Sequence, residues 1–275
     1  VDPNVYKNGI AVGIPYSDGQ YGLEIAAALG STGDPRKKLQ VLETVSSENK
    51  EKILGLVKQK KIGIRLDEQA NGLKIKAIVT TNIGKGFALI EHYHTNLTQL
   101  KVNDKNVELP SYCEMEKQNR KDIKISKLGL QKILKLADDI DYETSEYVMQ
   151  GIKMNMQIAH HGMEKDYGLC TGKKLKQIID QGMLGDDVAN YASYLTAAAV
   201  DARMGGASMP VMTNSGSGNQ GLGTIIPVMA FAGFNKITDK KLIIRAVTIS
   251  HMVSIYVKEH TGVLSCLCGC AHGAT

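Results

Sequence analysis

The residue types best suited to chemistry are concentrated between Asp201 and Gly221. This segment holds five glycines, three serines, two asparagines and a glutamine, and it precedes an apolar run at 225–231. Glycine costs too much backbone entropy inside a packed element, so the composition predicts a loop. Such a loop offers accessible backbone N–H groups with hydroxyl and amide side chains, which suits a carboxylate or phosphate where a helix begins next. A plain flexible connector is the alternative. Asp201 and Arg203 could form a structural pair that supports the loop.

The cysteines form a second candidate site near the end of the chain. Three of the five, Cys266, Cys268 and Cys270, fall within five residues. An odd number of cysteines without a secretory signal favours reduced thiols and a cytoplasmic protein. The C-x-C-x-C spacing is not a common zinc pattern, so two interpretations stay open: a soft-metal or iron–sulfur thiolate site, or small residues on a packed helix. Cys113 and Cys170 are expected to be inert thiols.

Composition excludes several classes of protein. Of 275 residues, 43% are apolar and 22% charged, which is typical of a globular chain and not of a disordered one. No apolar run is long enough to span a membrane, so no membrane partner is expected. The net charge of +5 comes from dispersed lysines, tryptophan is absent and phenylalanine is rare. The sequence therefore predicts no nucleic-acid partner.

The first 120 residues mix two hydrophobic periods, which predicts an α/β domain over 1–120. A helical pattern covers 21–30, 35–45 and 47–60, the second opening at Pro35. Alternating apolar residues predict strands at 10–14, 62–66, 73–79 and 86–90, with a hairpin over 97–110 around Asn103-Asp104.

Residues 121–275 follow a helical period and predict a mainly helical domain. Helical patterns occur over 130–137, 147–159, 175–181 and 242–253, and Thr238 is expected to cap the last of these. Residues 188–203 are rich in alanine and show no strand alternation, which also favours a helix. The predicted fold class is therefore α+β, an α/β unit followed by a mainly helical domain.

Several short motifs together carry a family resemblance that extends over essentially the whole chain. The most specific is Ser215-Gly-Ser-Gly-Asn-Gln-Gly221, preceded by Asp201-Ala-Arg-Met-Gly-Gly206. It resembles the signature of the L-cysteine desulfidase family, which is related to the alpha chain of iron–sulfur L-serine dehydratases. Further matching segments are Lys7-Asn8-Gly9, His94-Thr95-Asn96, Ser250-His251, Ile255-Tyr256 and Leu267-Cys268.

The resemblance implies a lyase that performs β-elimination on L-cysteine and releases sulfide, ammonia and pyruvate. It implies a [4Fe–4S] cluster with Cys268 as one ligand and with an open iron that binds the substrate. By the same resemblance, His251 and Asn8 are the candidate catalytic residues. The candidate residues for binding the small amino-acid substrate are His94, Thr95, Asn96, Ser215, Gly216, Ser217, Gly218, Asn219 and Gln220.

Several alternatives stay open beside this interpretation. L-serine could replace L-cysteine, because the same elimination then loses hydroxide. A protein that binds an amino acid without turnover, or a metal sensor built on Cys266, Cys268 and Cys270, belongs to another class. His94 could cap a strand end, and His251 could be a buried structural histidine.

The resemblance also predicts that the chain is a partial one. Members of the family extend further at both ends, with a Gly-Cys-Thr-Glu-Pro motif upstream and two more cluster cysteines downstream. The helical domain is therefore expected to be incomplete and the cluster to be held only in the longer protein. Helices rich in small residues are compatible with a homodimer.

Overall fold

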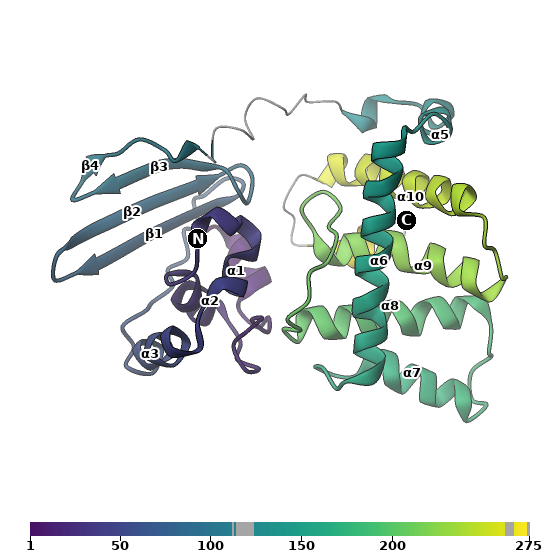
Figure 1. The fold of residues 1–275 in the computed structure, drawn as a ribbon, viewed down its shortest axis with the longest axis horizontal. Helices are drawn as coiled ribbons and strands as arrows, with labels where there is room; N and C mark the ends of the chain where they lie inside the picture. Colours follow the sequence, from purple (N-terminus) through teal and green to yellow (C-terminus); the bar gives the residue numbers. More distant parts are fainter. Residues whose placement is uncertain (112, 114–123, 262–266, 274–275) are drawn as a thin grey trace. The chain divides into compact units, whose positions relative to one another are not determined.

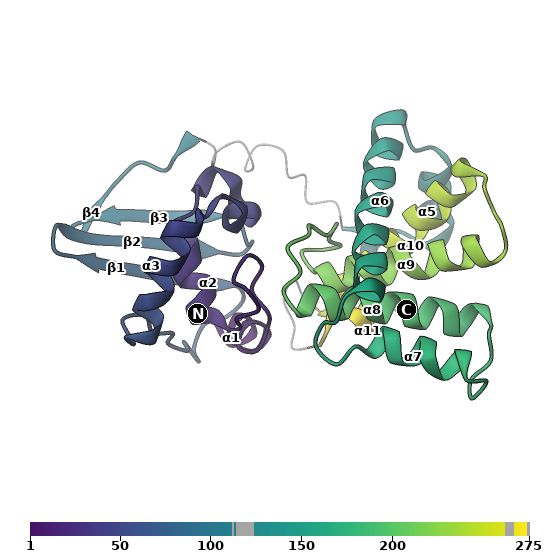
Figure 2. The ribbon, with the colours of Figure 1, turned by 60° about the horizontal axis from the view of Figure 1, so that its bottom comes forward.

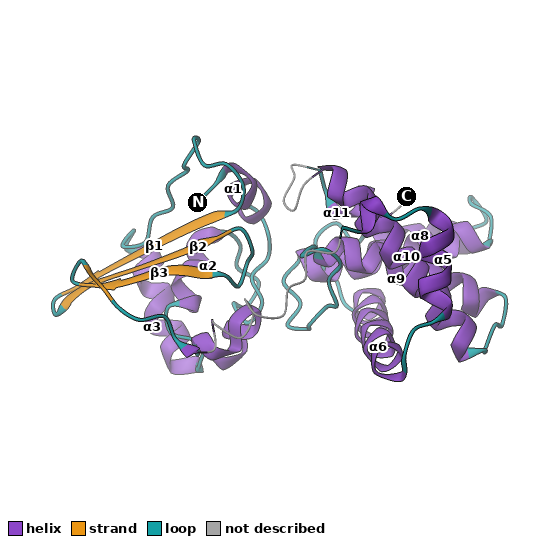
Figure 3. Cartoon of the chain, turned by 90° about the horizontal axis from the view of Figure 1, so that it is seen from above, coloured by secondary structure: helices purple, strands orange, loops and turns teal. Residues whose placement is uncertain are grey.

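The computed structural model describes residues 1–111, 113, 124–261 and 267–273, and the chain divides into two compact units (Figure 1). The N-terminal unit is Val1–Ile123, and the helical unit is Lys124–Thr275. In the described part of the chain every strand belongs to the N-terminal unit (Figure 3). The predicted α+β fold class is confirmed.

The N-terminal unit combines short helices with a four-stranded antiparallel sheet in the order β1-β2-β3-β4. Near its start, the fully buried carboxylate of Asp2 caps α1 by accepting the N–H groups of Asn4 and Val5. The same carboxylate accepts the N–H of Lys74 at the start of β1 and so links helix and sheet. The elements are α1 (Pro3–Gly9), α2 (Leu23–Gly30), the 3₁₀ helix η1 (Pro35–Thr44), α3 (Ser47–Lys58), β1 (Lys74–Thr81), β2 (Gly84–Glu91), β3 (Leu97–Val102) and β4 (Lys105–Asn106).

Two predicted strands of this unit are wrong. Residues 10–14 contribute only an isolated bridge between Gly13 and Tyr21, and residues 62–66 form no regular structure. Ile14 instead packs in a small core with Ile25, Leu29 and Leu54, so its apolar character serves helix packing and not a sheet. Alternation over five residues is too short to distinguish these two uses.

The predicted helix at 35–45 is a 3₁₀ helix with a break. Asp34 caps it and Pro35 opens it, but Lys38 has a φ of 50°, which interrupts the helical path. The predicted hairpin is confirmed, since Asn103 and Asp104 both have positive φ between β3 and β4. Positive φ at both central residues matches the right-handed twist of the flanking strands.

The helical unit packs long helices around one another. Its elements are the 3₁₀ helix η2 (Ile125–Lys127), α5 (Leu130–Asp138), α6 (Tyr142–Glu164), α7 (Thr171–Asp180), α8 (Val188–Met204), α9 (Gly218–Phe234), α10 (Lys240–Thr261) and α11 (Gly269–Gly273). One core lies among α6, α7, α8 and α9, where Ile158, Leu222 and Ile226 are fully buried. A second lies among α6, α9 and α10 around Ile225 and Val247.

Small residues allow the helices to approach closely. A Cβ on Gly162 or Gly172 would overlap backbone atoms of α8 at Ala198, so α6 and α7 each lie almost directly on α8. The alanines at 198, 199 and 202 are fully buried along that helix. Close helix packing through small side chains therefore organises this unit, and α9 lies at its centre (Figure 2).

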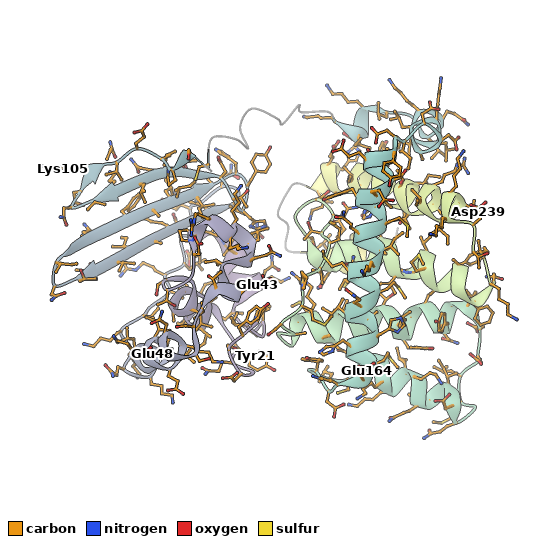
Figure 4. The ribbon with its side chains drawn as sticks, viewed as in Figure 1. Tyr21, Glu43, Glu48, Lys105, Glu164 and Asp239 are labelled. Carbon is orange, nitrogen blue, oxygen red and sulfur yellow. The ribbon has the colours of Figure 1, made fainter. Side chains whose placement is uncertain are left out.

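Two expectations about this unit are corrected. Residues 218–221 are not loop: they form the first turn of α9 and are all buried. Asp239, labelled in Figure 4, caps α10 in place of Thr238, because its Oδ1 accepts the N–H groups of Lys241 and Leu242. No helix within the described residues is both long and apolar enough to cross a membrane.

Candidate functional site

A tight hairpin leads into the N-terminus of α9. Asn214 and Ser217 exchange both backbone hydrogen bonds, at 3.1 and 2.9 Å. The two residues between them, Ser215 and Gly216, both have positive φ. A positive φ is strained for serine, so Ser215 indicates a position where the shape of the hairpin is required. Ser217 then caps α9 by accepting the N–H of Gln220.

Glycines in the first turns of α9 make room for neighbouring groups. A Cβ on Gly218 would overlap the guanidinium of Arg203, at the end of α8. A Cβ on Gly221 would overlap the carbonyl oxygen of Met212, in the segment before the hairpin. Glycine is required at these two helical positions because the surrounding groups come too close for any side chain. The close packing offsets the entropic cost of ordering a glycine in a helix.

Asn155 of α6 holds the segment that precedes the hairpin. Its fully buried amide donates to the carbonyl of Met212 at 3.1 Å and accepts the N–H of Met212 at 2.8 Å. This pairing satisfies both backbone groups of a non-helical residue inside the protein. The hairpin is thus held at one end by α6 and at the other by α9.

A buried chain of amides and hydroxyls connects the hairpin to α10. Gln220 donates from Nε2 to Asn214 Oδ1 at 3.2 Å and to Ser254 Oγ at 2.8 Å. Ser215 Oγ donates to the same Asn214 oxygen at 3.0 Å. Gln220 is fully buried, and within the described residues its Oε1 has no hydrogen-bond partner.

His251 of α10 belongs to the same chain and is held neutral. Asn214 Nδ2 lies 2.8 Å from His251 Nδ1, and an amide nitrogen can only donate, so Nδ1 accepts and the ring proton resides on Nε2. Burial lowers the pKa of His251 to about 4. At neutral pH the side chain is therefore an uncharged Nε2–H donor.

The short helix α11 packs against the first turns of α9. A Cβ on Gly269 would overlap Ser217 Oγ, and one on Gly273 would lie 3.0 Å from the Cα of Gly223. This close approach brings Cys268, the residue before α11, to Asn219, whose Nδ2 lies 3.7 Å from the Cys268 sulfur. The predicted metal ligand and the predicted substrate loop therefore meet.

Arg203 lies next to these thiols. Its Nη1 donates to Asn219 Oδ1 at 2.9 Å, and burial lowers the pKa of the guanidinium against the opposing influence of Cys268 and Cys270. Burial, with Cys268 beside it, raises the pKa of the Cys270 thiol. Cys268 itself is exposed, with the Asn219 amide beside its sulfur.

The expected pairing of Asp201 with Arg203 is not the arrangement found. Asp201 Oδ2 accepts the N–H of Gly172 at 3.0 Å and so holds the start of α7, while Arg203 bonds to Asn219. Asp201 and Arg203 are two residues apart in α8, about half a helical turn, so the structural carboxylate and the cation at the thiol pair lie on different sides of the helix.

The donor set fits part of an iron–sulfur site. Thiolates are the ligands that such clusters take, and N–H groups near the sulfur stabilise the bound form. Among the described residues no three histidine, cysteine or acidic side chains come together as a metal-binding group. The described residues thus supply Cys268 and its surroundings, and Cys266 lies outside them.

The remaining candidates belong to the N-terminal unit. Asn8 is exposed on α1, where its Oδ1 accepts from Lys7 Nζ. The segment 94–96 joins β2 to β3, and Asn96 bonds there to the carbonyl of Glu91 at 2.9 Å. Burial lowers the pKa of His94, which lies near Asp2. The helical unit thus brings together 215–220, His251 and Cys268, while Asn8, His94, Thr95 and Asn96 belong to the other unit.

Sequence reasoning missed three residues of this site. Asn155 has no sequence signal, since a single asparagine within a helix is normally exposed. Asn214 precedes the recognised motif by one residue. Ser254 and His251 lie on one face of α10, and this polar spacing within an apolar helix was the signal that could have found Ser254.

A strained hairpin, a glycine-containing helix start and a thiol beside it form one cluster in the helical unit. A family model described as serine dehydratase alpha chain matches residues 36–275, and the chain belongs to this family.

Relatives of similar sequence are found in several organisms. A UPF0597 protein of Desulforapulum autotrophicum is 37% identical over 281 residues, which cover all of this chain and 63% of that protein. A UPF0597 protein of Clostridioides difficile is 36% identical over 280 residues and 65% of its length. The chain thus spans just under two thirds of these relatives. No solved structure matches it.

Proposed function

We propose that this chain carries part of the site of an iron–sulfur-dependent lyase that acts on L-cysteine, with L-serine as the alternative substrate. Loss of the α-proton and of the β-thiol as hydrogen sulfide gives aminoacrylate. Its imine tautomer takes up water and releases ammonia and pyruvate. With L-serine the same steps release water in place of sulfide.

The observation that carries the proposal is the position of Cys268 at the start of α9. Its sulfur receives the Asn219 amide, and Arg203 bonds to the same asparagine, so the family motif and the candidate ligand form one cluster. When bound, a [4Fe–4S] cluster would supply a Lewis-acidic iron that polarises the substrate. Cys268 is the residue of this chain that would hold it.

The protein groups around that position have separable roles. The N–H groups at the very start of α9 would be offered to a carboxylate, apart from that of Gln220, which donates to Ser217 Oγ. Ser215 and Ser217 add hydroxyls at the hairpin. His251 in its neutral form donates from Nε2, which suits a hydrogen bond to a developing negative charge and not removal of the α-proton.

An anaerobic assay tests the proposal. The chain and the longer relative from Desulforapulum autotrophicum are reconstituted with iron and sulfide, and sulfide, ammonia and pyruvate are then measured with L-cysteine and with L-serine. Pyruvate with sulfide identifies the cysteine reaction, and pyruvate without sulfide the serine reaction. Absence of pyruvate from both substrates with the cluster bound to the longer relative would rule out the lyase.

The ligand role of Cys268 has its own test. Cys268→Ala in this chain, and the equivalent change in the longer relative, should lower bound iron and turnover together. Cys170→Ala removes a thiol that precedes α7 and is not part of the family motif, and it should leave both unchanged. Full iron content in Cys268→Ala would show that this cysteine is not a ligand.

A further inference from the structure

Cys268 and Cys270 form a pair of thiols at the start of α11, and the proposed lyase uses only the first of them. Cys268 directly precedes the helix and is exposed, while Cys270 lies in its first turn and is half-buried. A hydrogen bond joins the two side chains. Both are free thiols in the structure. The pair is therefore reduced, in contact, and open to solvent on the side of Cys268.

The backbone at this position allows the two sulfur atoms to bond covalently. Residues two apart have Cα atoms about 5.5 Å apart in a helical turn and at most about 7 Å apart in extended chain. Disulfides have Cα separations of about 4.4–6.8 Å, which overlaps this range. Residues two apart on a regular helix point to different sides, but Cys268 lies outside the helix, and its side chain meets that of Cys270.

Contacts with α9 hold the thiol pair in place. A Cβ on Gly269, the residue between the two cysteines, would overlap Ser217 Oγ and lie 2.8 Å from the backbone nitrogen of Gln220. The amide of Asn219 lies 3.7 Å from the Cys268 sulfur. Tertiary packing as well as spacing therefore brings Cys268 to Cys270.

We propose that Cys268 and Cys270 form a reversible disulfide in the cluster-free chain when it meets a small-molecule disulfide such as oxidised glutathione. The Cys268 sulfur attacks one sulfur of oxidised glutathione, whose S–S bond breaks, and one glutathione leaves as a thiol. The Cys270 sulfur then attacks the Cys268 sulfur, forms the new S–S bond and releases the second glutathione. The two cysteines lose two electrons and two protons, which reduce oxidised glutathione to two thiols.

This disulfide would act as a switch on the candidate iron–sulfur site. A sulfur held in a disulfide has no thiolate to give to iron, so Cys268 could not bind a cluster until a thiol reduced the bond. Exposed disulfides are the readily reduced ones, as a switch requires. This consequence rests on the proposed function, whereas the disulfide itself requires neither iron nor turnover.

Sequential labelling of thiols tests the pairing. The 275-residue chain, reduced and free of iron, is incubated anaerobically with oxidised glutathione. Free thiols are then blocked with iodoacetamide, and those recovered by reduction are labelled with N-ethylmaleimide. Two of the five thiols should be lost, and the second label should appear on Cys268 and Cys270 only. The intact mass before reduction should fall by two hydrogens, with no glutathione attached.

Matched variants identify the partner, because the C-x-C spacing also relates Cys266 to Cys268. Cys266→Ser should retain the disulfide. Cys270→Ser should stop at the first step and carry glutathione on Cys268. In urea, where the packing on α9 is lost, Cys266 should compete with Cys270 for Cys268, and the same exclusive pairing there would overturn the argument from packing.

Three outcomes in the folded chain would overturn the proposal: no loss of thiols, a disulfide that contains Cys266, or a bond between two chains. Because the assay uses no iron, it is independent of the lyase. A bond between Cys268 and Cys270 in a protein without lyase activity would uphold the inference and contradict only the proposed function. Lyase activity in the longer relative, with no disulfide in this chain, would do the reverse.

Discussion

Burial and one amide partner determine the chemistry that is open to His251. Its Nδ1 accepts from Asn214, and the lowered pKa keeps the ring neutral at physiological pH. A neutral imidazole whose acceptor is already occupied is a donor, and this form comes from tertiary contacts, while the catalytic role of His251 stays a prediction. No sequence pattern encodes the burial that lowers its pKa, because that burial is the sum of packing by several helices.

The pKa of His251 predicts a specific loss of stability in acid. A histidine titrates near 6.5 in the unfolded chain, and His251 titrates near 4 in the folded one. Between these values the unfolded state binds more protons, so the free energy of unfolding falls as the pH drops from about 6.5 to 4. The full effect, about 3 kcal/mol, is absent above pH 7 and complete below pH 4.

His251→Asn tests this prediction, because the asparagine oxygen can accept from Asn214 but does not titrate. Urea unfolding followed by circular dichroism at pH 7 and pH 4.5 should show a decrease in stability that is smaller in the variant by about 2 kcal/mol. His160→Asn replaces an exposed histidine of α6 and should retain the wild-type decrease. Equal decreases in wild type and His251→Asn would contradict the buried neutral state.

At the scale of elements, the start of α9 is where sequence reasoning and structure differ most. The glycines at 218 and 221 were expected to exclude this segment from any packed element, yet they lie in a buried helical turn. The backbone-entropy cost of glycine excludes it from a helix only where its lack of a side chain allows no additional contact. Here each glycine admits a neighbour that a side chain would displace, and only tertiary structure reveals that neighbour.

Two substitutions within α9 separate these cases. Gly221→Ala would place a methyl group on the carbonyl of Met212, whose position Asn155 fixes, so a loss of about 1–3 kcal/mol in unfolding free energy is expected. Gly233→Ala meets no atom within 4 Å and should stabilise the helix by roughly 0.5–1 kcal/mol. Chemical denaturation measures both, and destabilisation by Gly233→Ala or none by Gly221→Ala would refute the packing argument.

The helices themselves were the most predictable elements of the chain. The segment of α6 repeats its apolar face over several turns, so its existence followed from periodicity, whereas α8 was expected from its alanine content and lack of strand alternation. The predictions of strands at 10–14 and 62–66 were wrong because a few alternating residues do not determine what the segment packs against.

At the scale of the whole chain, each unit has a hydrophobic core of its own. The cluster of Ile14, Ile25, Leu29 and Leu54 lies within the N-terminal unit. The two cores around α9 consist only of residues from 148 onward, and they include fully buried side chains such as Leu222, Ile225 and Ile226. Sequence reasoning foresaw the change from mixed to helical periodicity along the chain, but not which helix would be central.

Residues 124–275 should therefore fold without the rest of the chain. All buried side chains of the two cores around α9 belong to this segment. The hydrogen bonds of Asn155, Asn214 and Gln220 also join residues of this segment. We expect a helical circular dichroism spectrum and a single cooperative thermal transition. Ile226→Ala, which empties a fully buried site, should destabilise that transition by about 2–5 kcal/mol, whereas Leu242→Ala, 46% exposed at the start of α10, should change it little. A non-cooperative transition, or equal effects of the two substitutions, would mean that the segment lacks an independent core and that its site cannot form without the N-terminal unit.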